Sequence, residues 1–98
     1  MKETYLYKNQ GVCSSHIKLV VDGDRLISAE YYGGCAGNTK GVAALVAGMP
    51  IAEVIDRLAG IRCGFKPTSC PDQMAKALTL IQNGENTPAL KKITEEEA

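Results

Sequence analysis

Four cysteines are the residues of this chain most suited to chemistry, and each falls where we expect one element to end or the next to begin. They are Cys13, Cys35, Cys63 and Cys70. A cysteine of the hydrophobic core would instead occupy an apolar position inside a helix or strand. Loops at one end of a sheet can converge, and soft thiolate ligands select Zn²⁺ or an iron–sulfur cluster. We therefore expect the four thiols to share one metal site, with Zn²⁺ as the first choice and an iron–sulfur cluster as the alternative.

Cys63 and Cys70 lie in one loop, with six residues between them, where one expected helix ends and another begins. Ser69 can cap the second helix, and Asp72 follows three residues later in a pattern like a capping box. A helix N-terminus favours the thiolate form of a cysteine, which binds metal or attacks a substrate. The two thiols could therefore form a redox-active pair instead, and this is the second hypothesis. The chain contains no Cys-x-x-Cys pair, so it lacks the zinc-ribbon and thioredoxin motifs.

Two other side chains could complete a metal site or replace a thiol in it. His16 follows Cys13 at Cys-x-x-His spacing, and Asp72 lies two positions after Cys70. Imidazole and carboxylate groups are both zinc ligands. The sequence leaves open whether either one replaces a cysteine, and no pattern in it indicates a catalytic residue.

The segment 33–38 contains three glycines around Cys35 and leads into an expected helix. A helix N-terminus can bind an anion through its backbone N–H groups, and Lys40 could contact a phosphate there. The segment lacks both the Walker spacing and the Gly-x-Gly-x-x-Gly fingerprint of dinucleotide sites. Nucleotide binding is therefore a third hypothesis, and a tight turn that presents Cys35 is the simpler reason for the glycines.

The elements that must position these residues are three strands followed by three helices. Alternating apolar residues predict strands over 3–8, 17–22 and 25–32, with a hairpin turn at 22–24. Apolar residues at i, i+3, i+4 and i+7 predict helices that include 42–49, 51–58 and 74–81. Because the strands come first and the helices after, we expect an α+β fold. In it, a three-stranded antiparallel meander is followed by three helices packed on one face.

Length and composition limit the further possibilities. Ninety-eight residues make one domain, which we place at 1–84, with a polar C-terminal tail at 85–98 where the apolar pattern fades. Eleven basic residues balance eleven acidic ones and tryptophan is absent, so we expect neither a nucleic-acid nor a membrane partner. No secretory signal or long apolar run is visible, which predicts a cytoplasmic protein. In that compartment cysteines serve metal binding or redox chemistry more often than disulfides.

The run Thr-Ser-Cys-Pro-Asp at 68–72 is the string that names the TSCPD domain, and the chain resembles its small stand-alone members over about residues 4–82. The resemblance also rests on segments 11–14, 33–38 and 60–64 and on Gln73. Similar domains occur at the C-terminus of adenosylcobalamin-dependent ribonucleotide reductases, and stand-alone copies are often labelled ribonucleoside-diphosphate reductase. A complete reductase needs a large barrel that 98 residues cannot form. The resemblance therefore implies a module associated with a reductase or another protein partner, with a cysteine-based, metal-binding site at Cys13, Cys35, Cys63 and Cys70. The sequence does not decide whether the chain is a homodimer.

A fainter similarity links the chain to the iron–sulfur cluster scaffold fold. Cys13, Cys35 and Cys70 match the three cysteines that hold a transient cluster or zinc in that family. The scaffold's aspartate after its first cysteine is absent here, and Ser69 stands where the scaffold has a histidine. Cys63 has no counterpart in the scaffold and could replace the lost ligand. The similarity implies the scaffold fold and a metal, and these departures favour a permanent metal over a donated cluster.

Overall fold

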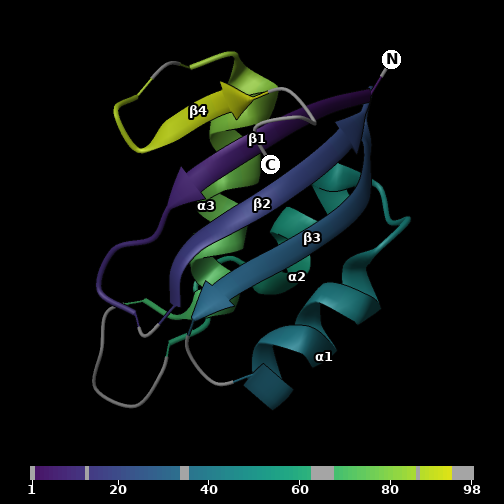
Figure 1. Cartoon of the computed structure of the whole chain (residues 1–98). Coiled ribbons are helices and arrows are strands. Elements are labelled where there is room, and N and C mark those ends of the chain that lie inside the picture. The colour runs from purple at the N-terminus through teal and green to yellow at the C-terminus, as the bar shows by residue number, and fades with distance from the viewer. Residues whose placement is uncertain (1, 13, 34–35, 63–67, 86, 94–98) are drawn as a thin grey trace.

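The computed structural model describes residues 2–12, 14–33, 36–62, 68–85 and 87–93, which form an antiparallel sheet and three helices (Figure 1). The sheet has four strands in the order β3-β2-β1-β4. The elements follow one another as β1 (Lys2–Lys8), β2 (Ser14–Asp22), β3 (Arg25–Gly33), α1 (Ala36–Val46), α2 (Ile51–Leu58), α3 (Cys70–Asn83) and β4 (Leu90–Ile93). The predicted α+β class and the three-stranded meander are confirmed.

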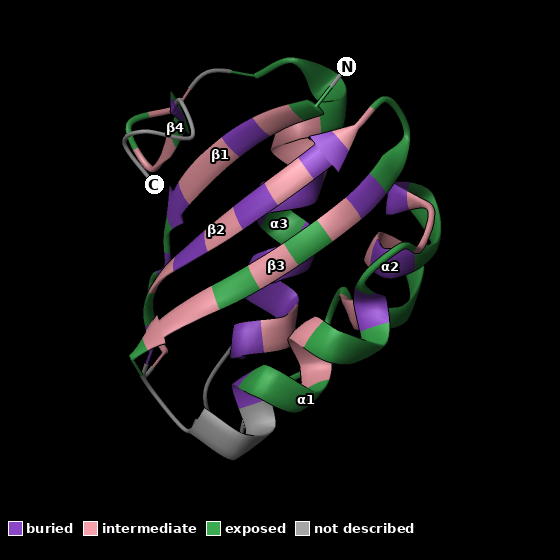
Figure 2. Ribbon diagram, turned by 45° about the vertical axis from the view of Figure 1, so that its right-hand side comes forward, coloured by how far each residue is buried: buried purple, intermediate pink, exposed green. Residues whose placement is uncertain are grey.

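The central strand β2 shows why the meander forms. Ile17, Leu19 and Val21 alternate with more polar residues and are 0%, 0% and 2% exposed. Successive side chains of a strand point to opposite faces, so this alternation gives β2 one apolar face. That face packs in one cluster with Val54 of α2 and Leu78 of α3, while buried positions recur along β2 and α3 in Figure 2. The core therefore lies between one face of the sheet and the helices.

A β-bulge changes which residue of β3 enters the core. Val20 pairs with Ser28 but Val21 pairs with Leu26, so Ile27 is passed over in the register. An extra residue in one strand shifts the alternation by one position. Leu26 is fully buried as a result. Strict alternation along the strand predicted over 25–32 would put Ile27 on the same face as Ala29 and Tyr31, and the bulge makes that expectation wrong at this position.

The helical spacing correctly predicted which apolar residues of α2 and α3 are buried, and it was less accurate for α1. Ile51 and Val54 of α2 are fully buried, as are Met74 and Leu78 of α3. In α1, Leu45 is 78% exposed, so the expected apolar face is narrower than the spacing indicated. The longest described helix has 14 residues, whereas spanning a bilayer takes about 20. Within the described ranges, no helix combines the length and the apolar character needed to cross a membrane.

The segment 85–98, which we expected to be only a polar tail, contributes the strand β4. β4 pairs antiparallel with β1, with Thr4 opposite Ile93 and Tyr7 opposite Leu90. Ile93 is 8% exposed. The strand has four residues with two lysines at its centre, so its sequence shows no alternation. It forms because β1 offers a free edge whose backbone groups need partners, and the expected three-stranded sheet has a fourth member.

Candidate functional site

The N-terminus of α3 meets the start of β2 and the end of β3 at one end of the sheet (Figure 1). Cys70, the first residue of α3, is 8% exposed. Its sulfur lies 3.0 Å from the Ser14 hydroxyl, which is a buried hydrogen-bond contact. Of the four predicted site cysteines, the structure describes Cys70, and Cys13, Cys35 and Cys63 lie outside the described residues.

The described neighbours of those three cysteines nevertheless meet near Cys70. Ser14, which follows Cys13 in the chain, contacts the Cys70 sulfur and is paired with Gly33 across the β2–β3 ladder. Gly33 precedes Cys35 by two residues. The Ser69 hydroxyl donates to the backbone carbonyl of Ile61 at 2.6 Å, and Ile61 precedes Cys63 by two residues. Three chain segments therefore converge on the first turn of α3.

Buried polar side chains surround this meeting point. Asn9 donates through Nδ2 to the Ser14 hydroxyl at 2.7 Å, and Ser14 is 2% exposed. The Tyr31 hydroxyl donates to the Cys70 carbonyl at 2.8 Å. Burial, and to a lesser degree the neighbouring Cys70, raises the pKa of Tyr31, so this hydroxyl stays a donor. The side of Cys70 that faces the sheet is therefore lined with fixed hydrogen bonds.

Asp72 ties the loop before α3 to the end of α2. The Thr68 hydroxyl donates to Asp72 Oδ2 at 2.5 Å, and the Gly60 backbone N–H donates to Oδ1 at 2.7 Å. The Asp72 backbone N–H donates in turn to the Ser69 hydroxyl at 3.2 Å, which is the expected N-cap bond. Burial alone would raise the pKa of Asp72, but the bonds from Thr68 and Gly60 and the charge of Lys76 outweigh it and lower that pKa. Both carboxylate oxygens thus accept hydrogen bonds within the protein, and Asp72 holds the loop before α3 to the end of α2.

Gln73 adds a second tie that sequence reasoning did not identify as part of the site. It is 2% exposed, accepts from the Gln10 backbone N–H at 3.1 Å and donates through Nε2 to Thr68 at 2.9 Å. It therefore joins the loop before β2 to the loop before α3. Asn9, Ser14 and Tyr31 were missed in the same way. Their signal in the sequence is weak, since each is a common polar or aromatic residue, and Ser14 and Tyr31 contact Cys70 from far along the chain.

His16 points away from this meeting point. It pairs with Lys8 while Ile17 pairs with Tyr7, and Ile17 and Tyr7 belong to the core. Alternation therefore puts the imidazole on the opposite face of the sheet, where Nδ1 lies 3.1 Å from the Ser15 hydroxyl. Within the described ranges, no three His, Cys, Asp or Glu side chains converge on one point. Lys40, the expected phosphate contact, is exposed on α1.

Comparison with known proteins gives one family result. A family model described as the TSCPD domain matches residues 2–82. The matched span runs from the start of β1 almost to the end of α3, so it contains every hydrogen bond described above. Neither the curated proteins nor the solved structures gave a match for this chain.

Proposed function

The chain belongs to the TSCPD domain family, and on that premise we propose that it is a small metal-binding module in which four cysteines hold one Zn²⁺. The proposed ligands are Cys13, Cys35, Cys63 and Cys70. The domain is one found in ribonucleotide reductases. We assign this chain a structural or docking role beside such a reductase or another protein partner, because 98 residues are too few for a complete reductase.

The convergence of three chain segments on Cys70 is the observation that supports this proposal. Gly33, two residues before Cys35, pairs with Ser14 across the sheet. Ile61, two residues before Cys63, accepts a hydrogen bond from Ser69 just before α3. Cys13 is adjacent to Ser14, which contacts the Cys70 sulfur. The convergence of these described neighbours around Cys70 supports a shared site for the four cysteines.

The chemistry of the donor set fits the proposed metal. Four thiolates match the tetrahedral coordination of structural zinc sites. Ser14 can donate a hydrogen bond to a ligating sulfur because its hydroxyl oxygen already accepts from Asn9. Outer hydrogen bonds of this kind orient metal ligands. An iron–sulfur cluster would use the same four ligands and is the alternative cofactor.

A thiol redox role for Cys63 and Cys70 is the second candidate. Thiol–disulfide exchange needs an accessible sulfur. Cys70 is 8% exposed and contacts a buried hydroxyl, so the structure gives this role less support. A nucleotide-binding accessory role is supported by no contact among the described residues.

Substitution with Co²⁺ tests the proposal, because thiolate ligands give Co²⁺ strong charge-transfer bands. We expect one equivalent of Co²⁺ to produce these bands together with the visible spectrum of a tetrahedral site, and Zn²⁺ to remove both. Serine at each of the four cysteine positions in turn should weaken the bands. His16→Asn is the matched control and should leave them unchanged. A folded, metal-free protein that forms a reversible disulfide and gives no cobalt bands would contradict the proposal and favour the redox role.

A further inference from the structure

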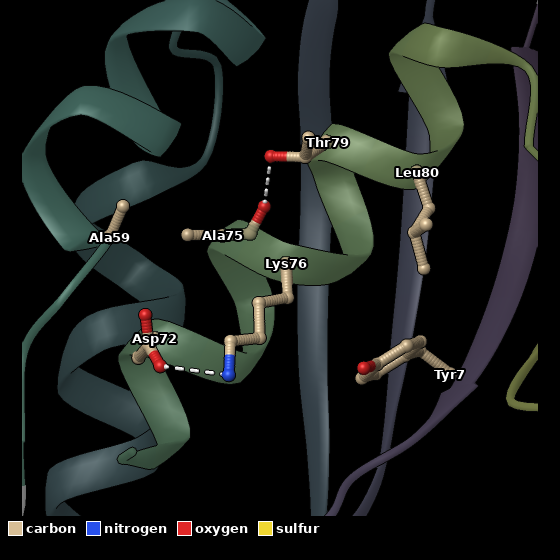
Figure 3. A pocket seen from close by; sticks show the side chains of 7 residues that line it. All are labelled: Tyr7, Ala59, Asp72, Ala75, Lys76, Thr79 and Leu80. Atoms are coloured by element: carbon tan, nitrogen blue, oxygen red, sulfur yellow. Dashed lines mark hydrogen bonds and ion pairs between the residues drawn. The ribbon is translucent and has the colours of Figure 1, made fainter. Parts of the chain in front are cut away.

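A pocket of about 440 Å³ lies beside α3 (Figure 3). Its walls come from β1, α3 and the residue after α2, and they are mostly apolar. The lining residues are Tyr7, Ala59, Asp72, Ala75, Lys76, Thr79 and Leu80. The Thr79 hydroxyl is already used, since it donates to the Ala75 carbonyl at 2.8 Å. This volume and these walls are typical of small-molecule sites.

The Tyr7 hydroxyl is the polar group that this pocket leaves unused. Tyr7 is 6% exposed, and its hydroxyl points into the pocket toward the side where Lys76 and Asp72 lie (Figure 3). Across the part of the chain that the structure describes, this hydroxyl has no hydrogen-bond partner. Burial and the nearby carboxylate of Asp72 raise the pKa of Tyr7, so the group keeps its proton and can donate. The Tyr7 hydroxyl is therefore an unused donor that a ligand entering the pocket can reach.

Lys76 supplies a second donor and limits the charge of any ligand. Its ammonium lies 3.5 Å from Asp72 Oδ2, and its side chain is about half exposed. Asp72 has its own bonds from Thr68 and Gly60, so Lys76 is not needed to satisfy it. The charges of Lys76 and Asp72 balance, and an anion placed between them would meet the carboxylate as well as the ammonium. The pocket therefore favours an uncharged hydrogen-bond acceptor.

We propose that this pocket binds a small, uncharged, mostly apolar molecule whose carbonyl-type oxygen accepts hydrogen bonds from Tyr7 and Lys76. The apolar body of the ligand contacts Ala59, Ala75 and Leu80. Asp72 belongs both to this pocket and to the hydrogen bonds before α3, but no cysteine is among the described residues that line the pocket, and the evidence for the pocket does not depend on a bound metal. The proposal concerns binding alone and assigns no reaction to the pocket.

Titration of the full chain with two matched probes, monitored by ¹H–¹⁵N NMR, tests the proposal. Acetophenone carries a ring and a carbonyl, and ethylbenzene has nearly the same shape without the acceptor. We expect acetophenone to cause saturable shifts at the amides of the lining residues and to bind more tightly than ethylbenzene. Tyr7→Phe should weaken acetophenone binding by about three- to tenfold, the value of one hydrogen bond. The same substitution should leave ethylbenzene binding unchanged.

Two further variants locate the site. Ala59→Leu fills the pocket from an exposed position after α2, and it should abolish binding of both probes without unfolding the chain. Tyr5→Phe removes a hydroxyl from the same strand outside the pocket lining and should change nothing. The proposal is overturned if no probe causes saturable shifts, or if Tyr7→Phe binds acetophenone as tightly as the natural chain. Unchanged binding in Ala59→Leu would also overturn it.

Discussion

The Ser14 hydroxyl lies 3.0 Å from the Cys70 sulfur, although 56 positions separate the two residues in the chain. Asn9 donates to the same hydroxyl oxygen at 2.7 Å, which leaves the serine's own hydrogen available to the sulfur. Both residues are buried. This contact joins the loop before β2 to the first turn of α3, and it places the residue after Cys13 against Cys70.

Ser14→Ala should destabilise the fold because it removes the hydroxyl that accepts from the buried Asn9 amide at 2.7 Å and leaves that amide only its longer contact to the Ser14 carbonyl at 3.4 Å. Losing one such hydrogen bond costs about 1 kcal/mol, and urea unfolding measures the loss. Ser15→Ala is the control, since the Ser15 hydroxyl is exposed and bonds to the Tyr32 carbonyl at 3.2 Å. We expect the control to change stability by less than about 0.5 kcal/mol. Equal losses in the two variants would show that the Ser14 contact is unimportant.

Asp72 should make stability depend on pH in the acid range. Its pKa is lower in the folded chain than in the unfolded one, so the unfolded chain binds the proton more readily. Its contribution is therefore complete above the pKa of an unfolded aspartate, near 3.9, and is lost as the pH falls through the folded pKa. Asp72→Asn should cost about 1–3 kcal/mol at neutral pH and flatten the acid dependence.

Urea midpoints measured from pH 7 down to pH 2.5 test the role of Asp72, with the exposed Asp56→Asn as the matched control. The control should keep both the stability and the acid slope of the natural chain. A steep acid slope that survives in Asp72→Asn would assign the dependence to another carboxylate.

Tyr31 should make stability depend on pH in the alkaline range. Its folded pKa is raised, so its contribution is complete below the pKa of an unfolded tyrosine, about 10, and is lost as the pH rises above that value. Tyr31→Phe should remove that alkaline loss, and at neutral pH it should cost about 1 kcal/mol through the missing bond to the Cys70 carbonyl. Tyr32→Phe, on the opposite face of β3, is the control. The account of Tyr31 fails if both variants behave alike in stability curves from pH 8 to 11.

Ile93 should matter to the fold even though it lies beyond the matched family span. It is 8% exposed and pairs with Thr4 on the edge of β1. Ile93→Ala should cost about 2 kcal/mol, the lower end for an aliphatic core residue. Lys91→Ala, at an exposed position of the same strand, should be nearly neutral. Equal, small effects from both would mean that residues 85–98 behave as the polar tail that the sequence indicated.

The sequence predicted the parts of the fold in which apolar residues recur at strand or helix spacing within one element. Ile17, Leu19 and Val21 alternate, and Met74 and Leu78 follow helical spacing, so their burial could be expected from neighbours in the chain. The bulge that buries Leu26 and the pairing of β4 depend on the partner strand, which no local pattern reveals.

The candidate site also has features that local sequence could predict and features that it could not. The position of Cys70 beside a capped helix start followed from Ser69 and Asp72, which lie within three residues of one another. The Ser14 contact and the Gln73 tie join residues more than 50 positions apart, so they became visible in the fold alone. Cys13, Cys35 and Cys63 lie outside the described residues, and their shared site stays a prediction.

Elemental analysis of anaerobically purified protein, with an optical spectrum of the same sample, tests the metal site most directly. The account predicts one zinc per chain and no colour. It also predicts that Cys70→Ser and Cys63→Ser lose the zinc and much of the folded structure, because metal binding energy is folding energy in small domains. One iron–sulfur cluster per chain would keep the four ligands and change the cofactor. Protein that is folded and free of metal would contradict the account.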